Sequence, residues 1–299
     1  MNYTLHQLLI FLEVVKQQSI TKAAAVMYMT QPALSIQLKN FQNQFDIPLT
    51  EVIGKQLYVT DFGKSIAEIA ENVIKEADAI KYKTKEYSDL IAGKLRISSA
   101  STGKYVIPYF LSGFQKRYPG IDIILDVSNK TTVVQNLKDN EVDFALVSVI
   151  PEGIDIEEEL LVENKIFKVS DKNISTKESP LIFREDGSAT RMAMDQYYKK
   201  AKERKSIKLT SNEAVKQAVI AGLGNSLIPL IGIKNELTNG ELHIIPSKGL
   251  PIVTSWRLIW LKKKKLSPIA LTYLDFLREK KEDIIQQKFD WYLKFKSPD

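Results

Sequence analysis

The chain has 299 residues, of which 44 % are apolar, enough to form two or more folded units with buried cores. It contains no cysteine, which excludes a disulfide framework, thiolate metal sites and cysteine nucleophiles. The formal net charge of +6 is typical of nucleic-acid-binding proteins, but residues 1–60 contain only four lysines against three acidic residues. A DNA-binding segment with so little net charge would need more than one copy per complex, or well-placed backbone N–H groups, to hold phosphates.

The sequence shows no signal for export or for membrane insertion. Residues 1–10 lack a basic region followed by a continuous apolar run, the pattern of a signal peptide. No stretch approaches the roughly 18 uninterrupted apolar residues that span a bilayer. We therefore expect a soluble, cytoplasmic protein without membrane association.

Two short helices are predicted at the start of the chain. Six apolar residues at helical spacing mark the first, which ends at Ser19: Leu5, Leu8, Leu9, Phe11, Leu12 and Val15. Thr21 is the expected N-cap of the second, which covers residues 22–27 and contains three alanines. Side chains as small as these let another helix pack closely.

A third helix is predicted after a short turn. Thr30 is its expected N-cap, Pro32 lies in its first turn, where proline is well tolerated, and the helix runs to about Phe45. A short helix, a tight turn and a longer helix have the geometry of a helix-turn-helix, whose second helix enters the major groove of DNA. The alternating residues 55–60 predict a wing strand beside it.

The exposed side of this third helix would carry Gln31, Ser35 and Lys39. Glutamine makes paired hydrogen bonds to adenine, serine reads either base edge, and lysine holds a phosphate or a guanine. A three-helix bundle with a polar solvent face would show the same residues, because such helix pairs also occur in proteins that never contact DNA. From these residues alone, both interpretations stay open.

Some sixty residues keep the spacing of one protein family. The matching stretches are FLEVV at 11–15, SITKAA at 19–24, TQPALSIQL at 30–38, PL at 48–49 and LYVTDFG at 57–63. The chain thereby resembles the LysR-type transcriptional regulators. The resemblance implies an α/β protein with an N-terminal winged helix-turn-helix, a long linker helix and a C-terminal two-lobed domain like the periplasmic binding proteins. The chain departs from the family at Thr50 and Val52, where Phe and Arg are usual, and at Ile36, where many members have a basic residue.

The resemblance also implies which positions contact DNA, within a helix-turn-helix over residues 19–38. Eight residues are predicted to bind DNA: Thr21, Thr30, Gln31, Pro32, Ser35, Ile36, Lys39 and Lys55. The departures replace basic side chains that family members have in the wing and at position 36. The apolar side chain of Ile36 could instead meet a thymine methyl group.

A single long helix is predicted over residues 62–92, which contain no proline and only one glycine. Its apolar residues form a stripe that Tyr87 continues: Ile66, Ile69, Ala70, Val73, Ile74, Ala77 and Ile80. A helix of roughly 28 residues is about 42 Å long, and one with a narrow apolar stripe usually needs a partner. The resemblance implies that this is the linker helix of a homodimer, and a tetramer is expected. The alternative is that the helix packs against its own C-terminal domain.

Residues 94–290 alternate strand-like and helix-like segments, which indicates an α/β domain with a mostly parallel sheet. The expected strands cover 95–100, 121–127, 143–149, 180–184 and 256–261, and the expected helices cover 107–114, 132–140, 212–221 and 267–281. The segment AGLGNSLIP at 221–229 is similar to a signature of the LysR family. The predicted domains are 1–61, 62–92 and 93–299, with lobe I at about 93–163 and 264–290 and lobe II at about 164–263.

Ligands in such folds bind at the carboxyl ends of strands, where N–H groups and hydroxyls hold anions. Eight residues at strand ends or helix starts are predicted to bind an effector: Ser99, Ser101, Thr102, Asn129, Ser148, Ser188, Thr190 and Arg191. Each serine or threonine could also be a simple N-cap. Because the resemblance places the effector in this cleft, we expect a pocket for a small anionic or polar metabolite.

The sequence therefore predicts a transcription regulator that binds double-stranded promoter or operator DNA and a small effector, with RNA polymerase as a further candidate partner. The alternative is a small-molecule-binding protein of the same two-lobed fold, which would not need the helix-turn-helix. No enzyme, cofactor or metal site is expected, since there is no nucleophile motif or phosphate loop, and His6 and His243 match no metal spacing. The lysines at 262–265 are interpreted as a solvated turn.

Overall fold

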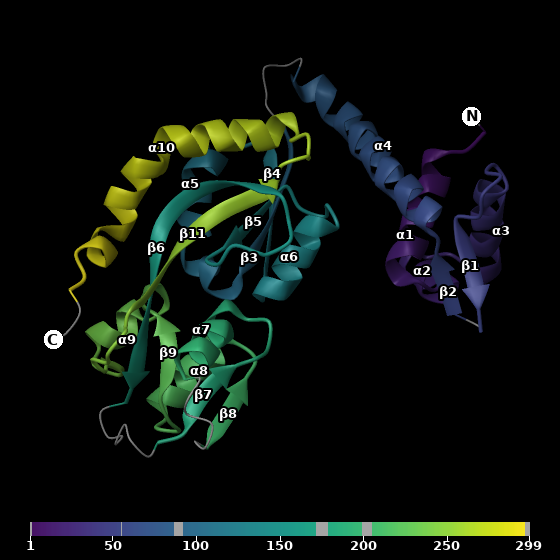
Figure 1. Ribbon diagram of the computed structural model, residues 1–299. Helices are drawn as coiled ribbons and strands as arrows, with labels where there is room; N and C mark the ends of the chain where they lie inside the picture. Colours follow the sequence, from purple (N-terminus) through teal and green to yellow (C-terminus); the bar gives the residue numbers. More distant parts are fainter. Residues whose placement is uncertain (1, 55, 87–91, 172–178, 199–204, 297–299) are drawn as a thin grey trace. The chain divides into compact units, whose positions relative to one another are not determined.

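The computed structural model describes residues 2–54, 56–86, 92–171, 179–198 and 205–296 (Figure 1). It contains two compact units, Met1–Leu90 and Ile91–Asp299, each with its own core. The division falls inside the segment 62–92 that was predicted as a linker helix.

The N-terminal unit is a small helical domain with a two-stranded wing. Its elements are α1 (Leu5–Gln17), α2 (Ile20–Val26), α3 (Gln31–Gln42), β1 (Thr50–Ile53), β2 (Gln56–Val59) and α4 (Asp61–Glu86). Phe11 of α1 packs on Phe41 of α3, with ring centroids 5.3 Å apart, and the small Ala23 of α2 is fully buried beside them. The apolar spacing along each helix thus places one face of all three helices in a common core.

The N-cap hydrogen bonds confirm one predicted helix start and correct another. Thr30 is the N-cap of α3, because its Oγ1 accepts a hydrogen bond from the backbone N of Ala33 at 3.4 Å. Thr21 was wrongly predicted as the N-cap of α2. Ser19 has that role, since its Oγ accepts from the N of Lys22, and Thr21 lies inside the first turn. Helix α3 ends at Gln42, before the predicted end near Phe45.

The wing is an antiparallel hairpin in which Val52 pairs with Leu57. Only its second strand was predicted, because the first shows no clear alternation of apolar and polar residues. The turn between the strands contains Gly54, whose φ of 57° is accessible to glycine at little cost. The wing packs on the start of α4, where the Thr60 hydroxyl donates to the carbonyl oxygen of Pro48 at 2.7 Å.

Helix α4 divides its apolar residues between two faces. Ala67 and Ala70 are buried in the core of the N-terminal unit. By contrast, Ile69, Val73 and Ile80 are exposed, at 60 %, 40 % and 72 %. The predicted single stripe is therefore two adjacent stripes. The first packs against the core of the N-terminal unit of the same chain. Residues 87–91 of the predicted linker, Tyr87 among them, lie outside the described residues.

The C-terminal unit is built on a seven-stranded mixed sheet with the order β10-β6-β11-β5-β3-β4, in which β9 also pairs with β6. These strands are β3 (Gly93–Ala100), β4 (Ile121–Ser128), β5 (Phe144–Val147), β6 (Ile156–Ser170), β9 (Ser226–Pro229), β10 (His243–Ile244) and β11 (Ile252–Leu261). Strand β3 is parallel to both β4 and β5, as predicted. The prediction of a mostly parallel sheet is wrong for the sheet as a whole, because the other pairings, which involve β6, β9, β10 and β11, are antiparallel. Strands β6 and β11 pair antiparallel and extend through both lobes. Strand β11 is longer than the predicted 256–261, and β6 was not predicted at all.

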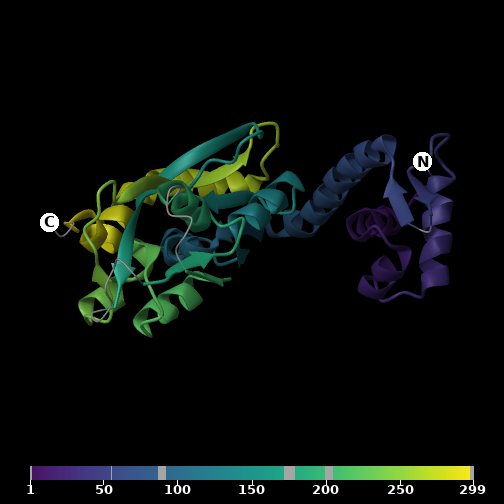
Figure 2. The same ribbon diagram turned by 60° about the horizontal axis from the view of Figure 1, so that its bottom comes forward.

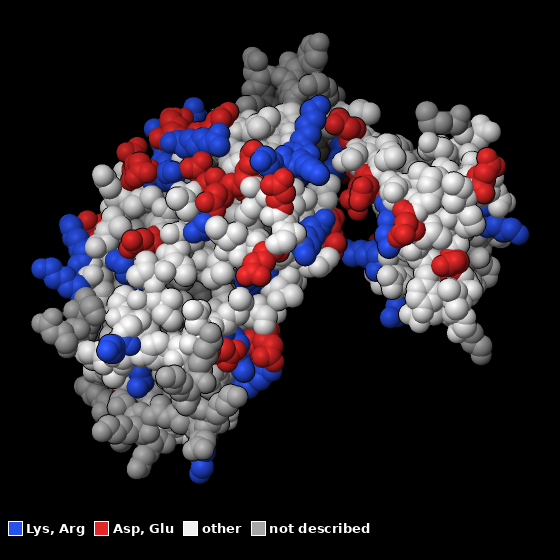
Figure 3. All heavy atoms as spheres, in the orientation of Figure 1, with Lys and Arg blue, Asp and Glu red and all other residues white. Residues whose placement is uncertain are grey.

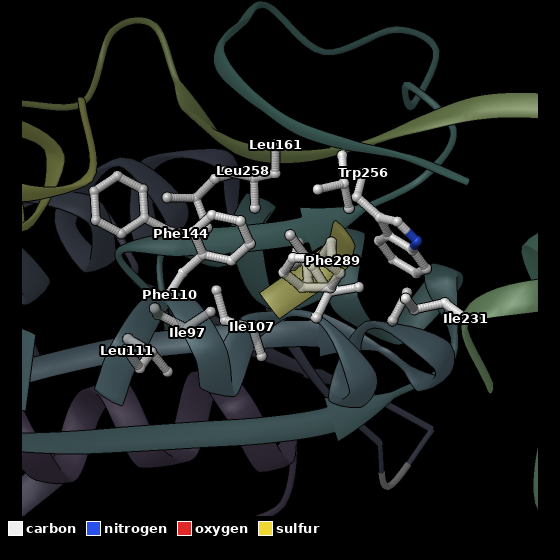
Figure 4. Close-up of a cluster of buried hydrophobic side chains, with 14 of the residues drawn as sticks. Ile97, Ile107, Phe110, Leu111, Phe144, Leu161, Ile231, Trp256, Leu258 and Phe289 are labelled. Atoms are coloured by element: carbon white, nitrogen blue, oxygen red, sulfur yellow. The ribbon is translucent and has the colours of Figure 1, made fainter. Parts of the chain in front are cut away.

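Lobe I consists of β3, β4 and β5 with α5 (Ile107–Arg117), α6 (Lys130–Lys138) and α10 (Pro268–Leu293). Strand β5 is buried on both faces: Phe144 joins the cluster under α5 and α10, whereas Ala145 joins the cluster under α6. In Figures 1 and 2, α10 lies beside α5 and β6. Helix α10 extends well beyond the predicted residue 281, and it buries Phe289 among the side chains shown in Figure 4.

Lobe II contains β7 (Leu181–Arg184), β8 (Ser206–Leu209), α7 (Ala189–Tyr197), α8 (Asn212–Ile220), α9 (Lys234–Thr238) and the strand β9. The short strands β7 and β8 form a parallel pair. The chain returns to lobe I within β11, since Arg257 already pairs with Val147 of β5. The return therefore comes before the predicted boundary at residue 264.

The lysine run at 262–265 is only partly a solvated turn. Lys264 is nearly buried, and its Nζ donates to the carbonyl oxygen of Val142 at 2.6 Å and lies 3.5 Å from the carboxylate of Asp143. The interpretation as a solvated turn is therefore wrong for Lys264, whose side chain ties the segment after β11 to the residues just before β5.

Candidate DNA-reading helix and effector cavity

Helix α3 presents polar side chains away from the core of the N-terminal unit. Thr30, Gln31, Pro32 and Lys39 are exposed, and Ser35 is half-buried beside them. Ile36 is 59 % exposed, although isoleucine is among the residues most often buried. These residues thus occupy an open side of α3. Thr21 is exposed on α2, and Lys55 lies outside the described residues.

One other polar residue of α3 faces inward. Gln37 Oε1 accepts a hydrogen bond at 3.2 Å from Nε2 of Gln7, which is nearly buried on α1. This contact ties α3 to α1 and keeps Gln37 out of the exposed side. The helix therefore has a structural polar residue and a separate solvent-facing set.

The turn between α2 and α3 exposes an aromatic residue that the sequence pattern did not single out. Tyr28 is 99 % exposed and has a φ of 52°, in the left-handed region that non-glycine residues rarely adopt. A tyrosine between two helices is more often part of a core, so its exposure could not be predicted from the residue pattern. On the face shown in Figure 3, the described residues of the N-terminal unit carry scattered charges of both signs and no continuous basic patch.

The C-terminal unit contains a cavity of about 200 Å³ between its two lobes. Six of the eight residues predicted to bind an effector line it: Ser101, Thr102, Asn129, Ser148, Ser188 and Thr190. They come from three separate segments of lobe I and from the start of α7 in lobe II. The fold therefore brings together residues that are up to 89 positions apart in the sequence.

Ser99 and Arg191 do not line the cavity. The hydroxyl of Ser99 is fully buried and donates to the carbonyl oxygen of Ala100 at 3.1 Å. Arg191 Nε lies 2.9 Å from the Asp195 carboxylate, and the guanidinium group stacks 4.8 Å from the ring centroid of Phe183. Its charge is thus neutralised on the surface of lobe II, and we remove both residues from the candidate set.

Three helices begin at the wall of the cavity. Asn129 caps α6, its Oδ1 accepting from the N of Thr132 at 3.0 Å. Ser188 caps α7, its Oγ accepting from the N of Arg191 at 3.1 Å. Asn212 is the first residue of α8. The N-cap interpretation therefore holds for Asn129 and Ser188, although both line the cavity. The N-terminal ends of helices carry partial positive charge and favour anions.

Lys130, the first residue of α6, adds a full positive charge to this wall. Burial lowers the pKa of its ammonium group below the ordinary value, and Glu152 partly offsets this effect. Its Nζ lies 3.9 Å from the sulfur of Met192 in lobe II. No carboxylate among the described residues lies within ion-pair distance of this Nζ, so the charge is available to a ligand.

Further lining residues were not singled out from the sequence: Arg184 ends a predicted strand but was not assigned to the site, and three others lie on two long strands. Arg184, at the end of β7, is almost fully buried; it pairs with Glu185 at 2.7 Å, and its Nη2 lies 3.3 Å from Ser101 Oγ of lobe I. Asn164, Thr254 and Trp256 line the cavity from β6 and β11. Only the pairing of these two long strands reveals that they form one wall of the cavity.

Within the described ranges there is no group of three or more His, Cys, Asp or Glu side chains that could hold a metal ion. Among the helices described, none is both long enough and apolar enough to cross a membrane.

Comparison with known proteins places both units in one family. Residues 5–64 match the model of the bacterial regulatory helix-turn-helix protein, lysR family, and residues 88–282 match the LysR substrate binding domain. The chain is 34 % identical over 289 residues to the HTH-type transcriptional activator CmpR of Synechocystis sp., covering 92 % of this chain and 95 % of CmpR. It is 32 % identical to the RuBisCO operon transcriptional regulator of Allochromatium vinosum, covering 93 % of this chain and 96 % of that regulator.

A solved structure supports the same assignment for the C-terminal unit. The regulatory domain of CcmR from Synechocystis, in complex with 2-PG, is 31 % identical and aligns with a TM-score of 0.59. The alignment covers 64 % of this chain and 98 % of that domain. Together with the two family models and the geometry of both units, these similarities confirm the resemblance found in the sequence. The chain belongs to the LysR family of DNA-binding transcriptional regulators.

Proposed function

We propose that the protein binds operator DNA through α3 and that a small organic anion in the cavity between the lobes changes this binding. One observation supports the effector half most strongly: the starts of α6, α7 and α8 and the ammonium group of Lys130 meet at a single cavity. Helix N-termini and an unpaired cation are the groups that proteins use to hold phosphates and carboxylates.

The proposed DNA contacts are the exposed residues of α3. Gln31 and Ser35 read base edges, Lys39 holds a phosphate, and Ile36 meets a thymine methyl group. Thr30 and Pro32, at the start of the helix, approach the backbone. Thr21 on α2 and Lys55 in the wing complete the proposed set of phosphate contacts.

A dimer would compensate for the small net charge of each N-terminal unit. We propose that the exposed face of α4, defined by Ile69, Val73 and Ile80, packs against the same face of a second copy. Two N-terminal units held together in this way would read two half-sites of an operator, as helix-turn-helix dimers do. Further assembly into a tetramer and contact with RNA polymerase would follow at the promoter, in the cytoplasm where chromosomal DNA lies. We propose no catalytic role.

The proposed effector is a metabolite small enough for a cavity of about 200 Å³ and negatively charged at neutral pH. The solved relative from Synechocystis binds 2-PG in its regulatory domain. The cavity described here offers a similar class of ligand a cation, three helix N-termini and the side chain of Thr190. Closure of the two lobes on the anion would then alter the spacing of the DNA-binding heads.

The decisive experiment measures DNA binding by fluorescence anisotropy, using the DNA upstream of the protein's own gene. We expect a salt-sensitive, saturable association that a panel of phosphorylated and carboxylated metabolites shifts by at least about fivefold for one member. A thermal-unfolding screen with the same panel identifies that member, since a ligand that binds the folded state raises the Tm. Binding of a metabolite without any DNA association would favour the alternative, a small-molecule-binding protein. Absence of both would contradict the proposal entirely.

A further inference from the structure

Two side chains in one wall of the cavity have polar atoms that lack a partner. Asn164 on β6 and Trp256 on β11 both line the cavity, and they are only 1 % and 2 % exposed. Across the part of the chain that the structure describes, neither the Oδ1 of Asn164 nor the Nε1 of Trp256 has a hydrogen-bond partner. Buried polar atoms are nearly always satisfied, because leaving one unpaired costs its full desolvation penalty.

The position of Trp256 results from an irregularity in the strand pairing. Ser255 pairs with Glu163, but the next pair along is Arg257 with Leu160, so the register of β11 against β6 shifts at Trp256. Bulges of this kind re-aim a side chain and often occur next to functional sites. Figure 4 shows the Trp256 ring at the edge of the buried hydrophobic cluster, with its nitrogen on the side away from Phe289.

The second tryptophan of β11 shows how the same chain satisfies a buried indole. Trp260 is 4 % exposed, and its Nε1 donates to the carboxylate of Glu157 at 3.0 Å. Both tryptophans lie on the same strand, four residues apart, yet only the one in the cavity wall is left without an acceptor. The missing acceptor of Trp256 is therefore not a general feature of the buried tryptophans on this strand.

Asn164 is held in place by its other amide atom. Its Nδ2 donates to the Oγ1 of Thr254 at 3.0 Å, across the pair of strands in which these two residues face each other. In this arrangement Nδ2 is engaged and Oδ1 is left as an acceptor. The wall thus offers one N–H donor from an indole and one acceptor from an amide.

The chemistry of these two atoms selects the group that would satisfy both. A fully ionised carboxylate or phosphate group accepts from an indole but cannot donate to an amide oxygen, and an ammonium group donates but cannot accept. A hydroxyl group does both. We propose that Trp256 and Asn164 form a hydroxyl-binding subsite, so that the effector is an organic anion carrying at least one alcohol group. This inference rests on the proposed function, which supplies the anion-binding end at Lys130.

The test compares three probes that differ only in their alkyl part: inorganic phosphate, n-propyl phosphate and glycerol 3-phosphate. Isothermal titration calorimetry with the full-length protein should give an affinity for glycerol 3-phosphate at least about tenfold higher than that for n-propyl phosphate. In Trp256→Phe, which keeps an aromatic ring but removes the N–H group, this ratio should fall to nearly one. Asn164→Leu, which removes the acceptor at similar volume, should reduce the ratio in the same way.

The matched control is Trp260→Phe, the same change on the same strand outside the cavity, which should retain the preference for glycerol 3-phosphate. Equal affinities of the wild type for the two organic phosphates, or an unchanged ratio in both cavity variants, would overturn the hydroxyl subsite. The anion-binding proposal would then still stand on the binding of the phosphates themselves. If none of the three probes binds the wild type, the anion cavity and the subsite both fail. DNA binding, measured separately, decides whether the regulator assignment of α3 survives.

Discussion

Asn212 of lobe II donates a hydrogen bond from Nδ2 to the Oγ1 of Thr102 in lobe I, directly at the cavity between the lobes. Two similar contacts lie nearby: Arg184 reaches Ser101 Oγ at 3.3 Å, and the Thr131 backbone N donates to the Gly187 carbonyl oxygen at 3.2 Å. The groups that hold the lobes together are therefore neighbours of those proposed to hold the effector. A ligand at this place acts on the same contacts that set the distance between the lobes.

The first prediction concerns this bridge. Asn212→Ala removes one hydrogen bond of the closed arrangement, so the open arrangement gains population and effector affinity falls by about three- to tenfold. Hydrogen–deuterium exchange should rise at residues 101–105 and at the start of α8. Asn239→Ala, on the exposed end of α9, is the control and should leave both measurements unchanged. Exchange rates that match the wild type in Asn212→Ala would show that this bond does not hold the lobes.

The second prediction concerns the cation in the cavity. Lys130→Met should weaken anion binding by about 10- to 100-fold, the range that corresponds to a charge-assisted hydrogen bond. Because burial lowers the pKa of Lys130, its ammonium group loses the proton at a lower pH than an ordinary lysine does. Wild-type affinity for the anion should therefore fall as pH rises through that lowered pKa, and this dependence should vanish in Lys130→Met. Lys138→Met, at the other end of α6, should show neither effect.

The third prediction tests the exposed side of α3. Gln31→Ala and Ser35→Ala should each reduce the preference for operator over unrelated DNA by about 1–3 kcal/mol, because each removes a base contact. The measurement is anisotropy with both DNA sequences, together with circular dichroism to show that the fold is intact. Asn40→Ala, an exposed change about 180° around the helix from Gln31, is the control. Unchanged operator affinity in both variants would remove α3 as the reading helix.

The fourth prediction concerns assembly. Ile69→Lys combined with Ile80→Lys places two charges on the exposed face of α4, so dimers should dissociate at micromolar concentration in analytical ultracentrifugation. The buried face of the same helix, around Ala67 and Ala70, is untouched, and the N-terminal unit should keep its fold. The control variant Glu68→Lys, whose new charge lies on a different side of α4, should still form dimers. A double variant that still dimerises would place the interface elsewhere.

The fifth prediction is structural. A Cβ at Gly63 would lie 2.1 Å from the carbonyl oxygen of Leu49, so the start of α4 can approach the wing only with glycine there. Gly63→Ala should lower the free energy of unfolding by about 1–3 kcal/mol. Without this contact, alanine inside a helix would instead stabilise by up to about 1 kcal/mol. Urea unfolding measures whether the free energy of unfolding falls or rises. The control Ser65→Ala, on the exposed side of α4, should leave this free energy almost unchanged.

Much of the N-terminal unit could be predicted from short stretches of sequence. Thr30 and Pro32 mark the start of α3, and the spacing of Leu34, Leu38 and Phe41 shows which face is buried. These features depend on neighbours three or four residues away, which the helix itself brings together. Even there, local signals were ambiguous: Ser19 and Thr21 are both good caps, and only the hydrogen bond to Lys22 shows which one is used.

The sequence also indicated six lining residues of the cavity, because strand ends and helix starts of an α/β fold meet at one edge. Lys130 and Arg184 were not assigned in this way, since charged side chains are usually solvated, and only the fold shows that Asn212 at the start of α8 reaches the same cavity. Arg191 shows the opposite error, because its charge is used by Asp195 one turn away.

By itself, the sequence determined the approximate places of the first three helices and of five strands of the C-terminal unit, and the family that the chain resembles, because these depend on local spacing and on residues in fixed order. Only the tertiary structure decided that Asn164 and Trp256 share a wall with residues from both lobes, and that the apolar stripe of α4 divides into a buried and an exposed half. Burial and pairing depend on segments that are distant in the chain, and the free energy of an unpaired indole N–H or an uncovered isoleucine depends on the neighbours that folding supplies.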